Sequence, residues 1–372
     1  MTKNINTQRL LNQFLELVKI ASPSRQEGDF AEHMCRELVS LGFNVATDAA
    51  GTVIGGNCGN IIATLPGAKS AETIMFCCHM DTVTPCENIH PVVTGDVIHA
   101  DGTTILSGDD KGGIAAIFEA VRQVQEQKIA HGTIQVVLTI GEEIGMYGSK
   151  NLDYSKIQAK KAFILDADGP LGNIVIQGPA KNVIKATIYG KAAHAGMYPE
   201  QGINAIQVAA RAIDQMKLLR IDTETTANIG TIAGGTATNI VTDQVDIVAE
   251  ARSLSNDKLA VQSQHMKACF EKAAYDFGAC VDVKIEPSYS AFQLKTDDAV
   301  VLQCSAAMKS LGLKPKLVST GGGSDCNVFN AHGITAVDLA IGMTDVHTKA
   351  ESIKISDLAA TTCLIVEIIK QN

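Results

Sequence analysis

Apolar residues recur at helical spacing in two segments near the start of the chain. Between residues 7 and 20 they fall three or four positions apart, and Pro23 follows as a stop signal. A second segment of this kind runs from residue 26 to 41 and ends at Gly42. Short runs of consecutive apolar residues come next, which is typical of buried strands. We therefore predict two helices, then strands at 60–65 and 73–78, a helix at 111–127, and strands at 133–140 and 161–166.

The pattern changes after about residue 180. We predict, in order, a strand at 182–189, a helix at 204–218, strands at 226–232 and 239–251, a helix at 257–277 and a strand at 279–286. This β-α-β-β-α-β order is the split βαβ pattern of a ferredoxin-like domain. From residue 297 helices and strands alternate as before, at 297–311, 333–340 and 356–370. The economical prediction is one α/β domain, formed by residues 1–180 and 291–372, with a smaller α+β domain inserted at 181–290.

Composition excludes several classes of protein. The 372 residues, 46% of them hydrophobic, suffice for more than one domain. With 31 basic and 40 acidic side chains and no long charged run, we expect no nucleic-acid partner. No segment approaches the roughly 18 apolar residues that cross a bilayer, and Met1 to Arg9 is polar, so we expect no membrane association and a cytoplasmic location. The ten cysteines fall mostly in apolar segments and are interpreted as reduced thiols.

His79 and Asp81 end the strand predicted at 73–78. The period of two in a strand puts both side chains on one face, at the carboxyl end of the sheet, where α/β sheets place ligands. An imidazole followed two residues later by a carboxylate suits a metal-binding histidine whose other ring nitrogen is held by the acid. A surface turn that happens to contain both residues is the alternative.

Two pairs of adjacent acids stand out. Asp109 and Asp110 lie in Ser-Gly-Asp-Asp-Lys-Gly-Gly at a junction between loop and helix, where acids also serve as helix caps. Glu142 and Glu143 follow the strand at 133–140 directly. Because neighbouring carboxylates repel one another, two of them after a buried strand indicate a nearby cation. If one binds a metal, the other can take a proton from a water on that metal.

Asp166 ends the strand at 161–166, and His347 lies in Asp-Val-His-Thr-Lys-Ala-Glu. Four strand ends thus carry an acid or a histidine at one edge of the predicted sheet. Asp168 remains the alternative to Asp166. Oxygen and nitrogen ligands without a thiolate favour zinc, manganese or cobalt, and the imidazoles favour zinc among them.

These motifs, together with Ala193-His194-Ala195-Gly196, resemble in order and spacing the two-zinc exopeptidase family that includes peptidase T, carboxypeptidase G, succinyl-diaminopimelate desuccinylase and the aminoacylases. The resemblance covers almost the whole chain, and Gly108-Asp109-Asp110-Lys111 and residues 166–172 are most similar to the peptidase T branch. It implies an α/β/α catalytic domain of the zinc-exopeptidase type, with an inserted ferredoxin-like α+β domain that acts as a lid and in dimerisation.

The resemblance also implies a role for each motif residue. The ligands of two zinc ions would be His79, Asp109, Glu143, Asp166 and His347. Asp109 would bridge both ions, Asp81 would orient His79, and Glu142 would be the general base. Both ions together would polarise the scissile carbonyl of a bound substrate.

Further implied roles fall in the insertion. His194 would reach the active site of the partner subunit and donate to the substrate carbonyl, and Asn239 and Arg252 would contact the substrate carboxylate. The glycine run at 320–325 lacks the Gly-Lys-Ser/Thr of a phosphate loop, and in the family such a turn lines the substrate pocket.

The resemblance therefore implies a homodimeric, metal-dependent peptidase for short peptides, most like a tripeptide aminopeptidase, with two Zn²⁺ per chain that Co²⁺ or Mn²⁺ can replace. An N-acyl amino acid amidohydrolase or carboxypeptidase of the same family is the alternative, because the sequence does not fix which end of the substrate is recognised. A binding protein that kept the fold but lost hydrolysis is disfavoured, because Glu142 and every ligand are present.

Overall fold

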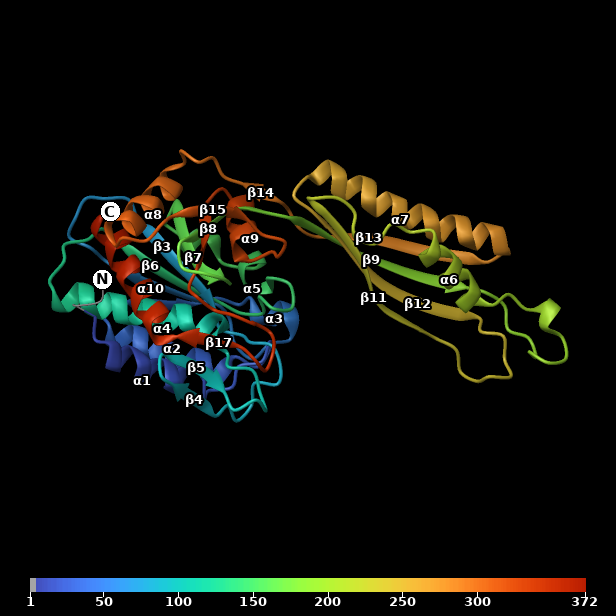
Figure 1. Cartoon of the computed structure of the whole chain (residues 1–372), viewed down its shortest axis with the longest axis horizontal. Coiled ribbons are helices and arrows are strands. Elements are labelled where there is room, and N and C mark those ends of the chain that lie inside the picture. Colours follow the sequence, from blue (N-terminus) through green and yellow to red (C-terminus); the bar gives the residue numbers. More distant parts are fainter. Residues whose placement is uncertain (1–4) are drawn as a thin grey trace. The chain divides into compact units, whose positions relative to one another are not determined.

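The structure is a computed structural model that describes residues 5–372 (Figure 1). The first four residues, part of the polar N-terminal segment considered above, lie outside the described residues. The chain forms two compact units. Unit 1 comprises Met1–Ile176, Gln293–Ser319 and Ser324–Asn372, and unit 2 comprises Gln177–Phe292 and Thr320–Gly323. Within residues 5–372, every helix is too short or too polar to cross a bilayer.

Unit 1 is built around a mixed nine-stranded sheet of order β1-β2-β6-β3-β7-β16-β8-β14, with β15 beside β8. The strands are β1 (Asn44–Thr47), β2 (Ile61–Leu65), β3 (Ile74–His79), β6 (Ile134–Thr139), β7 (Lys161–Ala167), β8 (Asn173–Gly178), β14 (Phe292–Gln293), β15 (Lys316–Ser319) and β16 (Thr335–Ala340). The neighbours β6, β3, β7 and β16 are parallel. β3 and β6 are buried at every residue, because helices cover parallel strands on both faces.

Helices flank this sheet on both sides. α4 (Gly108–Glu126) packs against β3 and β7, and α1 (Thr7–Leu17) and α10 (Ile355–Lys370) pack against α4. α8 (Ala299–Ser310) packs against α10, β7 and β16. α9 (Asp325–Ala331) and α5 (Tyr147–Lys150) pack together on the other side of these strands (Figure 1). The remaining helices are α2 (Gly28–Ser40), α3 (Gly51–Ile54) and the short 3-10 turn at Tyr154–Lys156. The arrangement confirms the predicted α/β/α fold.

Two aromatic side chains in the core pack against each other between β3 and β7, the strands that carry His79 and Asp166. Phe76 on β3 and Phe163 on β7 are fully buried, with ring centroids 5.5 Å apart. Truncating a buried phenylalanine costs about 3 to 5 kcal/mol of stability. The pair therefore stabilises the parallel contact between the strands that end near His79 and Asp166.

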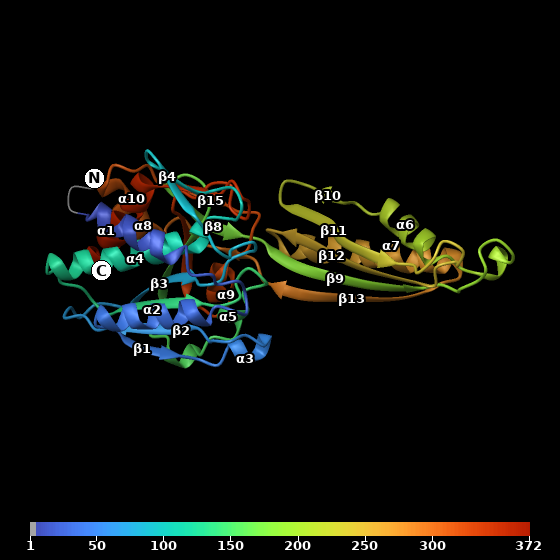
Figure 2. The same ribbon diagram turned by 90° about the horizontal axis from the view of Figure 1, so that it is seen from below.

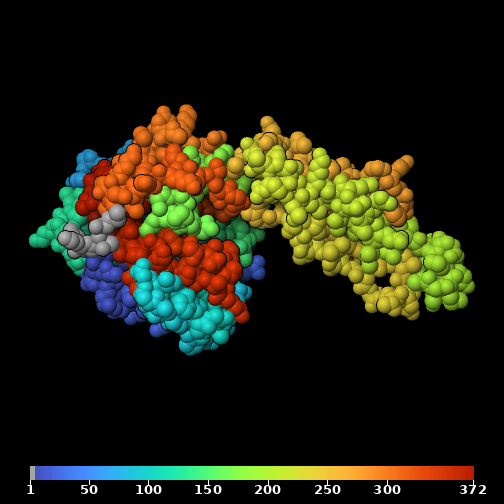
Figure 3. All heavy atoms as spheres, in the orientation of Figure 1, coloured from blue at the N-terminus to red at the C-terminus, as the bar shows by residue number. Residues whose placement is uncertain are grey.

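A second, three-stranded sheet lies at the surface of unit 1, in the order β17-β5-β4. It consists of β4 (Pro91–Thr94), β5 (Val97–Ala100) and β17 (Ser352–Lys354), all paired antiparallel. The space-filling view shows the cyan segment near residue 95 beside the red segment near residue 350 (Figure 3). This sheet is not predicted by the pattern of apolar residues, because strands of three or four residues are too short to show alternation.

Unit 2 is a five-stranded sheet of order β10-β11-β12-β9-β13 with two helices packed on it (Figure 2). Its elements are β9 (Ala180–Tyr189), the 3-10 turn Pro199–Gln201, α6 (Ala205–Asp214), β10 (Leu219–Arg220), β11 (Thr225–Gly234), β12 (Gln244–Ser253), α7 (Asn256–Phe277) and β13 (Cys280–Tyr289). Burial alternates along β12, because one face packs against α6 and α7 in a separate core. The order confirms the predicted split βαβ pattern. The strand predicted to begin at residue 239 begins at Gln244 instead.

Candidate two-metal active site

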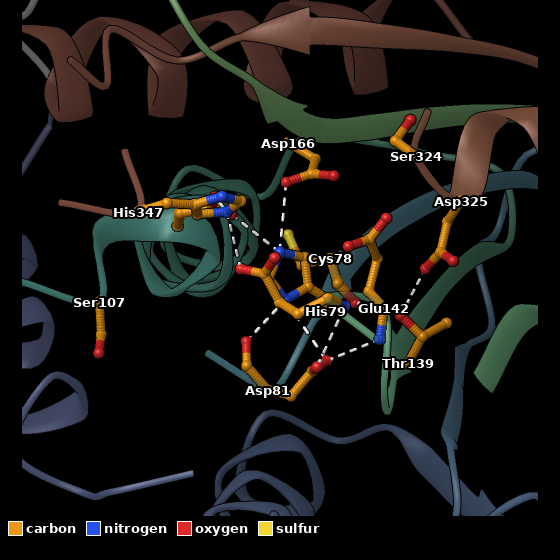
Figure 4. A network of polar contacts seen from close by, with 12 residues as sticks. Cys78, His79, Asp81, Ser107, Thr139, Glu142, Asp166, Ser324, Asp325 and His347 are labelled. Carbon is orange, nitrogen blue, oxygen red and sulfur yellow. Dashed lines mark hydrogen bonds and ion pairs between the residues drawn. The ribbon is translucent and has the colours of Figure 1, made fainter. Parts of the chain in front are cut away.

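The parallel strands of unit 1 bring the predicted site residues to one edge of the sheet (Figure 4). His79 is the last residue of β3, and Asp166 is the last but one of β7. Glu142 and Glu143 lie in the turn after β6, and His347 lies in the loop that follows β16. The expectation that four strand ends meet at one edge is confirmed by this pairing.

A first group of possible metal ligands consists of His79, Asp109 and Asp166. His79 Nε2 lies 2.8 Å from Asp109 Oδ1 and 3.3 Å from Asp166 Oδ1. The imidazole is almost completely buried. Among the described residues, the structure brings Asp166 to His79 and leaves Asp168 outside both groups.

A second group consists of Asp109, Glu143 and His347. His347 Nε2 lies 3.1 Å from Asp109 Oδ2 and 3.0 Å from Glu143 Oε1. The side chain of His347 is half exposed, whereas that of Glu143 is nearly buried. Each carboxylate oxygen of Asp109 therefore faces a different imidazole, as expected of a carboxylate that bridges two cations.

The chemistry of the donors fits a pair of divalent cations. Burial and the charge of Asp109 raise the pKa of Asp166, and burial and the charge of Asp166 raise the pKa of Glu142. Hydrogen bonds with Asp109 and Glu143 raise the pKa of His347 to about 10, which shows that the surrounding carboxylates favour a positive charge at this position. Crowded carboxylates with two imidazoles and no thiolate are suited to zinc, cobalt or manganese.

Asp81 contacts both His79 and the Glu142–Glu143 turn, through different atoms. Its backbone oxygen lies 2.7 Å from His79 Nδ1, whereas its nearest carboxylate oxygen is 3.6 Å away. A carbonyl oxygen can only accept, so Nδ1 carries the proton and Nε2 is free to bind a metal. The carboxylate accepts the backbone N–H groups of Glu142 (2.9 Å) and Glu143 (3.2 Å) and the hydroxyl of Ser24 (2.7 Å). Asp81 therefore orients His79 through its main chain and fixes the Glu142–Glu143 turn through its side chain.

Glu142 is buried beside the two groups and belongs to neither among the described residues. Its turn is held from a second side, where Glu27 Oε1 accepts the N–H of Gly141 at 3.1 Å. The backbone of Glu142 is thus fixed while its carboxylate remains available, which is the arrangement that a general base requires.

Helix capping was the alternative role for Asp109 and Asp110, and Asp109 does not act as a cap. Both residues depart from helical dihedral angles, and the peptide bond between them is cis. The carboxylate of Asp109 faces the two imidazoles instead of the helix amides. Asp110 is fully buried, and burial followed by the charge of Asp166 raises its pKa.

Two further acids support the site and were not predicted from the sequence. Asp325 accepts hydrogen bonds from the hydroxyls of Thr139 and Ser149, both at 2.5 Å. Asp338 Oδ1 accepts the N–H of Asp166 at 3.1 Å, and its Oδ2 accepts the hydroxyl of Ser324. An aspartate inside the apolar strand at 335–340 is a signal that could have identified Asp338.

The three predicted substrate contacts lie in unit 2 at two separate places. His194 Nδ1 accepts the N–H of Gly196 and Met197, and its loop pairs with the loop that carries Asn239 through the N–H of Ala195. Arg252, near the other end of β12, is paired with Glu250 at 2.8 Å. Its partner on β9 is Lys181, close to where the chain enters unit 2. At about 3.3 Å per residue, β12 holds Arg252 roughly 25 Å from the end where His194 and Asn239 lie.

Comparison with known proteins agrees with this geometry. Residues 75–371 match the family described as peptidase family M20/M25/M40. The protein named YqjE of Bacillus subtilis is 46% identical over 99% of both chains. The crystal structure of aminopeptidase PepT from Bacillus cereus is 45% identical, with a TM-score of 0.91 over 99% of both chains. A tripeptidase from Staphylococcus aureus is 39% identical, with a TM-score of 0.95 over 99% of this chain and 98% of the other.

The family match spans most of the chain and includes every predicted ligand of unit 1. The likeness to the two solved peptidases extends over both units. The chain therefore belongs to peptidase family M20/M25/M40 and is a hydrolase of the metallopeptidase class.

Proposed function

We propose that this protein is a metal-dependent peptidase that hydrolyses short peptides in the cytoplasm, most like a tripeptide aminopeptidase. The observation that carries the proposal is the arrangement of two ligand groups that share Asp109, with Glu142 buried beside them and free of both. Similarity to proteins named aminopeptidase PepT and tripeptidase, over nearly the whole chain, supports the choice of substrate class.

The residues of the two groups would hold two Zn²⁺ per chain, and Co²⁺ or Mn²⁺ could replace them. When bound, these ions supply positive charge that polarises a scissile carbonyl and makes a water molecule more acidic. Asp109 would contact both ions, His79 and Asp166 the first, and Glu143 and His347 the second. Asp81 would keep the metal-binding nitrogen of His79 unprotonated through its backbone oxygen.

Glu142 would accept the proton of the attacking water and pass it to the amine that leaves. Burial and the charge of Asp166 raise the pKa of Glu142, which makes its carboxylate a stronger base than an exposed glutamate. The contact between Asp81 and the Glu142 N–H keeps the carboxylate in place during the transfer. The proton moves from water to the carboxylate and then to nitrogen, so Glu142 ends the cycle as it began.

We further propose that the protein works as a homodimer through unit 2. Asn239 and His194 lie at the end of β12 opposite Arg252, so one unit cannot present all three residues at one point. A second subunit would supply His194, which would donate a hydrogen bond to the oxyanion, an interaction worth roughly 3 to 4 kcal/mol. Mixing His194→Ala with Glu142→Ala chains would then restore activity after subunit exchange, because each heterodimer has one site with both residues intact. No recovery despite proven exchange would contradict the shared site.

The test of substrate class is a screen of tripeptides, dipeptides and N-acyl amino acids on chelator-treated protein resupplied with zinc or cobalt. We expect no activity without metal, and preferential release of the N-terminal residue from tripeptides when metal is present. Hydrolysis of N-acyl amino acids, or removal of the C-terminal residue, in place of tripeptide cleavage would contradict the proposal. Full activity of the metal-free chain would contradict the two-metal chemistry.

A further inference from the structure

Glu351 joins the loop that carries His347 to the loop that carries Asp109. Its Oε2 accepts the backbone N–H groups of Leu106 at 2.8 Å and Ser107 at 3.0 Å, and its Oε1 accepts that of Asp109 at 3.0 Å. The side chain is only 1% exposed. Because both carboxylate oxygens are occupied by amides, Glu351 lies outside both ligand groups although it is an acid beside the site.

The three amides lie in the segment that leads into α4, where Asp109 and Asp110 depart from helical dihedral angles, so these N–H groups need partners outside the helix. A capping side chain usually accepts such groups, but the side chain of Ser107 makes no capping bond. Glu351 takes this role, although it lies 244 positions after Ser107 in the sequence. A buried carboxylate that accepts three backbone N–H groups forms charge-assisted hydrogen bonds with them. Gly108 permits the approach, since a Cβ at that position would lie 3.0 Å from Glu351 Oε1.

The loop of Glu351 is itself closed. Backbone hydrogen bonds of 3.0 and 3.1 Å between Thr344 and Ser352 join its two ends, and Glu351 donates its N–H to the carbonyl of Thr348 at 3.1 Å. His347 lies inside this closed loop, with Nε2 3.1 Å from Asp109 Oδ2. A single buried side chain therefore fixes the backbone of one ligand relative to the loop of another.

We propose that Glu351 is a positioning residue that sets the spacing of Asp109 and His347 and so determines the affinity of the second metal ion. The proposal rests on the two-metal function proposed above. The first group depends on it less, because His79 and Asp166 lie on paired strands whose spacing the sheet fixes.

Glu351→Gln tests this role with little change in shape. The amide keeps one accepting oxygen, but its NH₂ group must face at least one backbone N–H that the carboxylate accepted. We expect the affinity for the second ion to fall about 10- to 100-fold, the range typical of residues that orient metal ligands, and the affinity for the first to change by less than about threefold. Glu351→Asp keeps the charge at shorter reach and should recover part of the loss.

Glu119→Gln is the matched control. Glu119 is also a fully buried glutamate of unit 1 and lies further along α4 than Asp109, but it pairs with Arg9 at 2.7 Å, accepts from Gln123 and belongs to neither ligand group. Its substitution should lower stability without changing the ratio of the two metal affinities. The comparison thus separates a positioning effect from the general cost of replacing a buried charge.

The measurement is a titration of the metal-free, full-length chain and its variants with cobalt(II) chloride, followed by calorimetry and by cobalt absorption. Selective loss of the weaker binding step in Glu351→Gln supports the proposal. Unchanged binding of both ions, or equal weakening of both as in a destabilised chain, overturns it. If Glu351→Gln does not fold, hydrogen exchange of residues 106–109 in the unmodified chain decides: slow exchange supports the proposal, and fast exchange overturns it.

The outcomes for the two proposals differ. A wild-type chain that binds two ions but cleaves no peptide contradicts the proposed function, while selective loss of the second ion in Glu351→Gln still supports the positioning role. A Glu351→Gln chain with both ions and full peptidase activity contradicts the positioning role alone. A wild-type chain that binds fewer than two ions contradicts both.

Discussion

The two ligand groups share one carboxylate and yet are held in different ways. The first takes His79 and Asp166 from β3 and β7, so the hydrogen bonds of a buried parallel sheet fix them. The second takes Glu143 from a turn and the half-exposed His347 from a loop. Each of these two segments is fixed by a buried carboxylate that accepts hydrogen bonds from backbone N–H groups. Asp81 has this role for the turn, and Glu351 has it for the loop. From this difference we predict that the first group binds its ion more tightly and that the ion of the second group exchanges more readily.

The largest effect is expected from Asp109→Asn, because Asp109 is the one residue common to both groups. The amide removes the negative charge and one accepting oxygen, so both ions should be lost and peptidase activity with them. His347→Ala should lose the second ion only. The number of ions that remain bound per chain after gel filtration distinguishes the two variants. Retention of either ion at wild-type affinity by Asp109→Asn would show that the carboxylate is not shared.

Glu142→Gln should lower turnover about a hundredfold or more and leave both ions in place, because Glu142 belongs to neither group. Glu143→Gln should instead lose the second ion. Steady-state kinetics on a tripeptide together with metal analysis distinguishes the two variants. If the two variants exchanged these behaviours, the roles of the adjacent glutamates would have to be reversed.

Asp81→Asn should affect the second site more than the first. The backbone oxygen that orients His79 is kept, but the amide cannot accept the N–H groups of both Glu142 and Glu143. We expect turnover and second-ion affinity to fall roughly 10- to 100-fold, with the first ion retained. Competition with a chelator measures both affinities. A larger loss at the first site would mean that the carboxylate, not the main chain, orients His79.

Glu27→Gln should have the smallest effect. Burial, followed by the charge of Asp81, raises the pKa of Glu27 above its ordinary value of 4.5, so the folded state disfavours the charged form. Stability from this group is therefore lost as the pH rises from about 4.5 through the raised pKa. The amide oxygen can still accept the N–H of Gly141. Activity should stay within about twofold, and urea midpoints at pH 5 and pH 7 should fall less steeply with pH than in the wild type. A strong loss of stability at pH 7 would contradict this reasoning.

Much of the framework could be predicted from the sequence because its signals are local. The helix predicted at 257–277 is α7 (Asn256–Phe277), since a 22-residue helix shows its period over many turns. Apolar runs at 73–78 and 161–166 predicted buried strands, and the residues that end them, His79 and Asp166, do meet. The rule that parallel strands share a carboxyl edge was enough to bring these ligands together.

What could not be predicted depends on contacts between distant segments. Glu351 and Ser107 are 244 positions apart, and Asp81 and Glu142 are 61 apart, so no local pattern reports their hydrogen bonds. The carboxylate of Asp81 was expected on His79, but its backbone oxygen is the closer partner. Only the folded backbone shows which amides a buried acid must satisfy.

The most direct test of the two-group site is a crystal structure of the zinc-loaded chain with anomalous data collected at the zinc edge, at saturating and at limiting zinc. We expect two peaks at saturation, one among His79, Asp109 and Asp166 and the other among Asp109, Glu143 and His347. At limiting zinc the peak beside His79 should dominate, because its ligands lie on paired strands. A single peak at saturation, or a zinc ion bound by Glu142 or Asp168, would contradict the shared site.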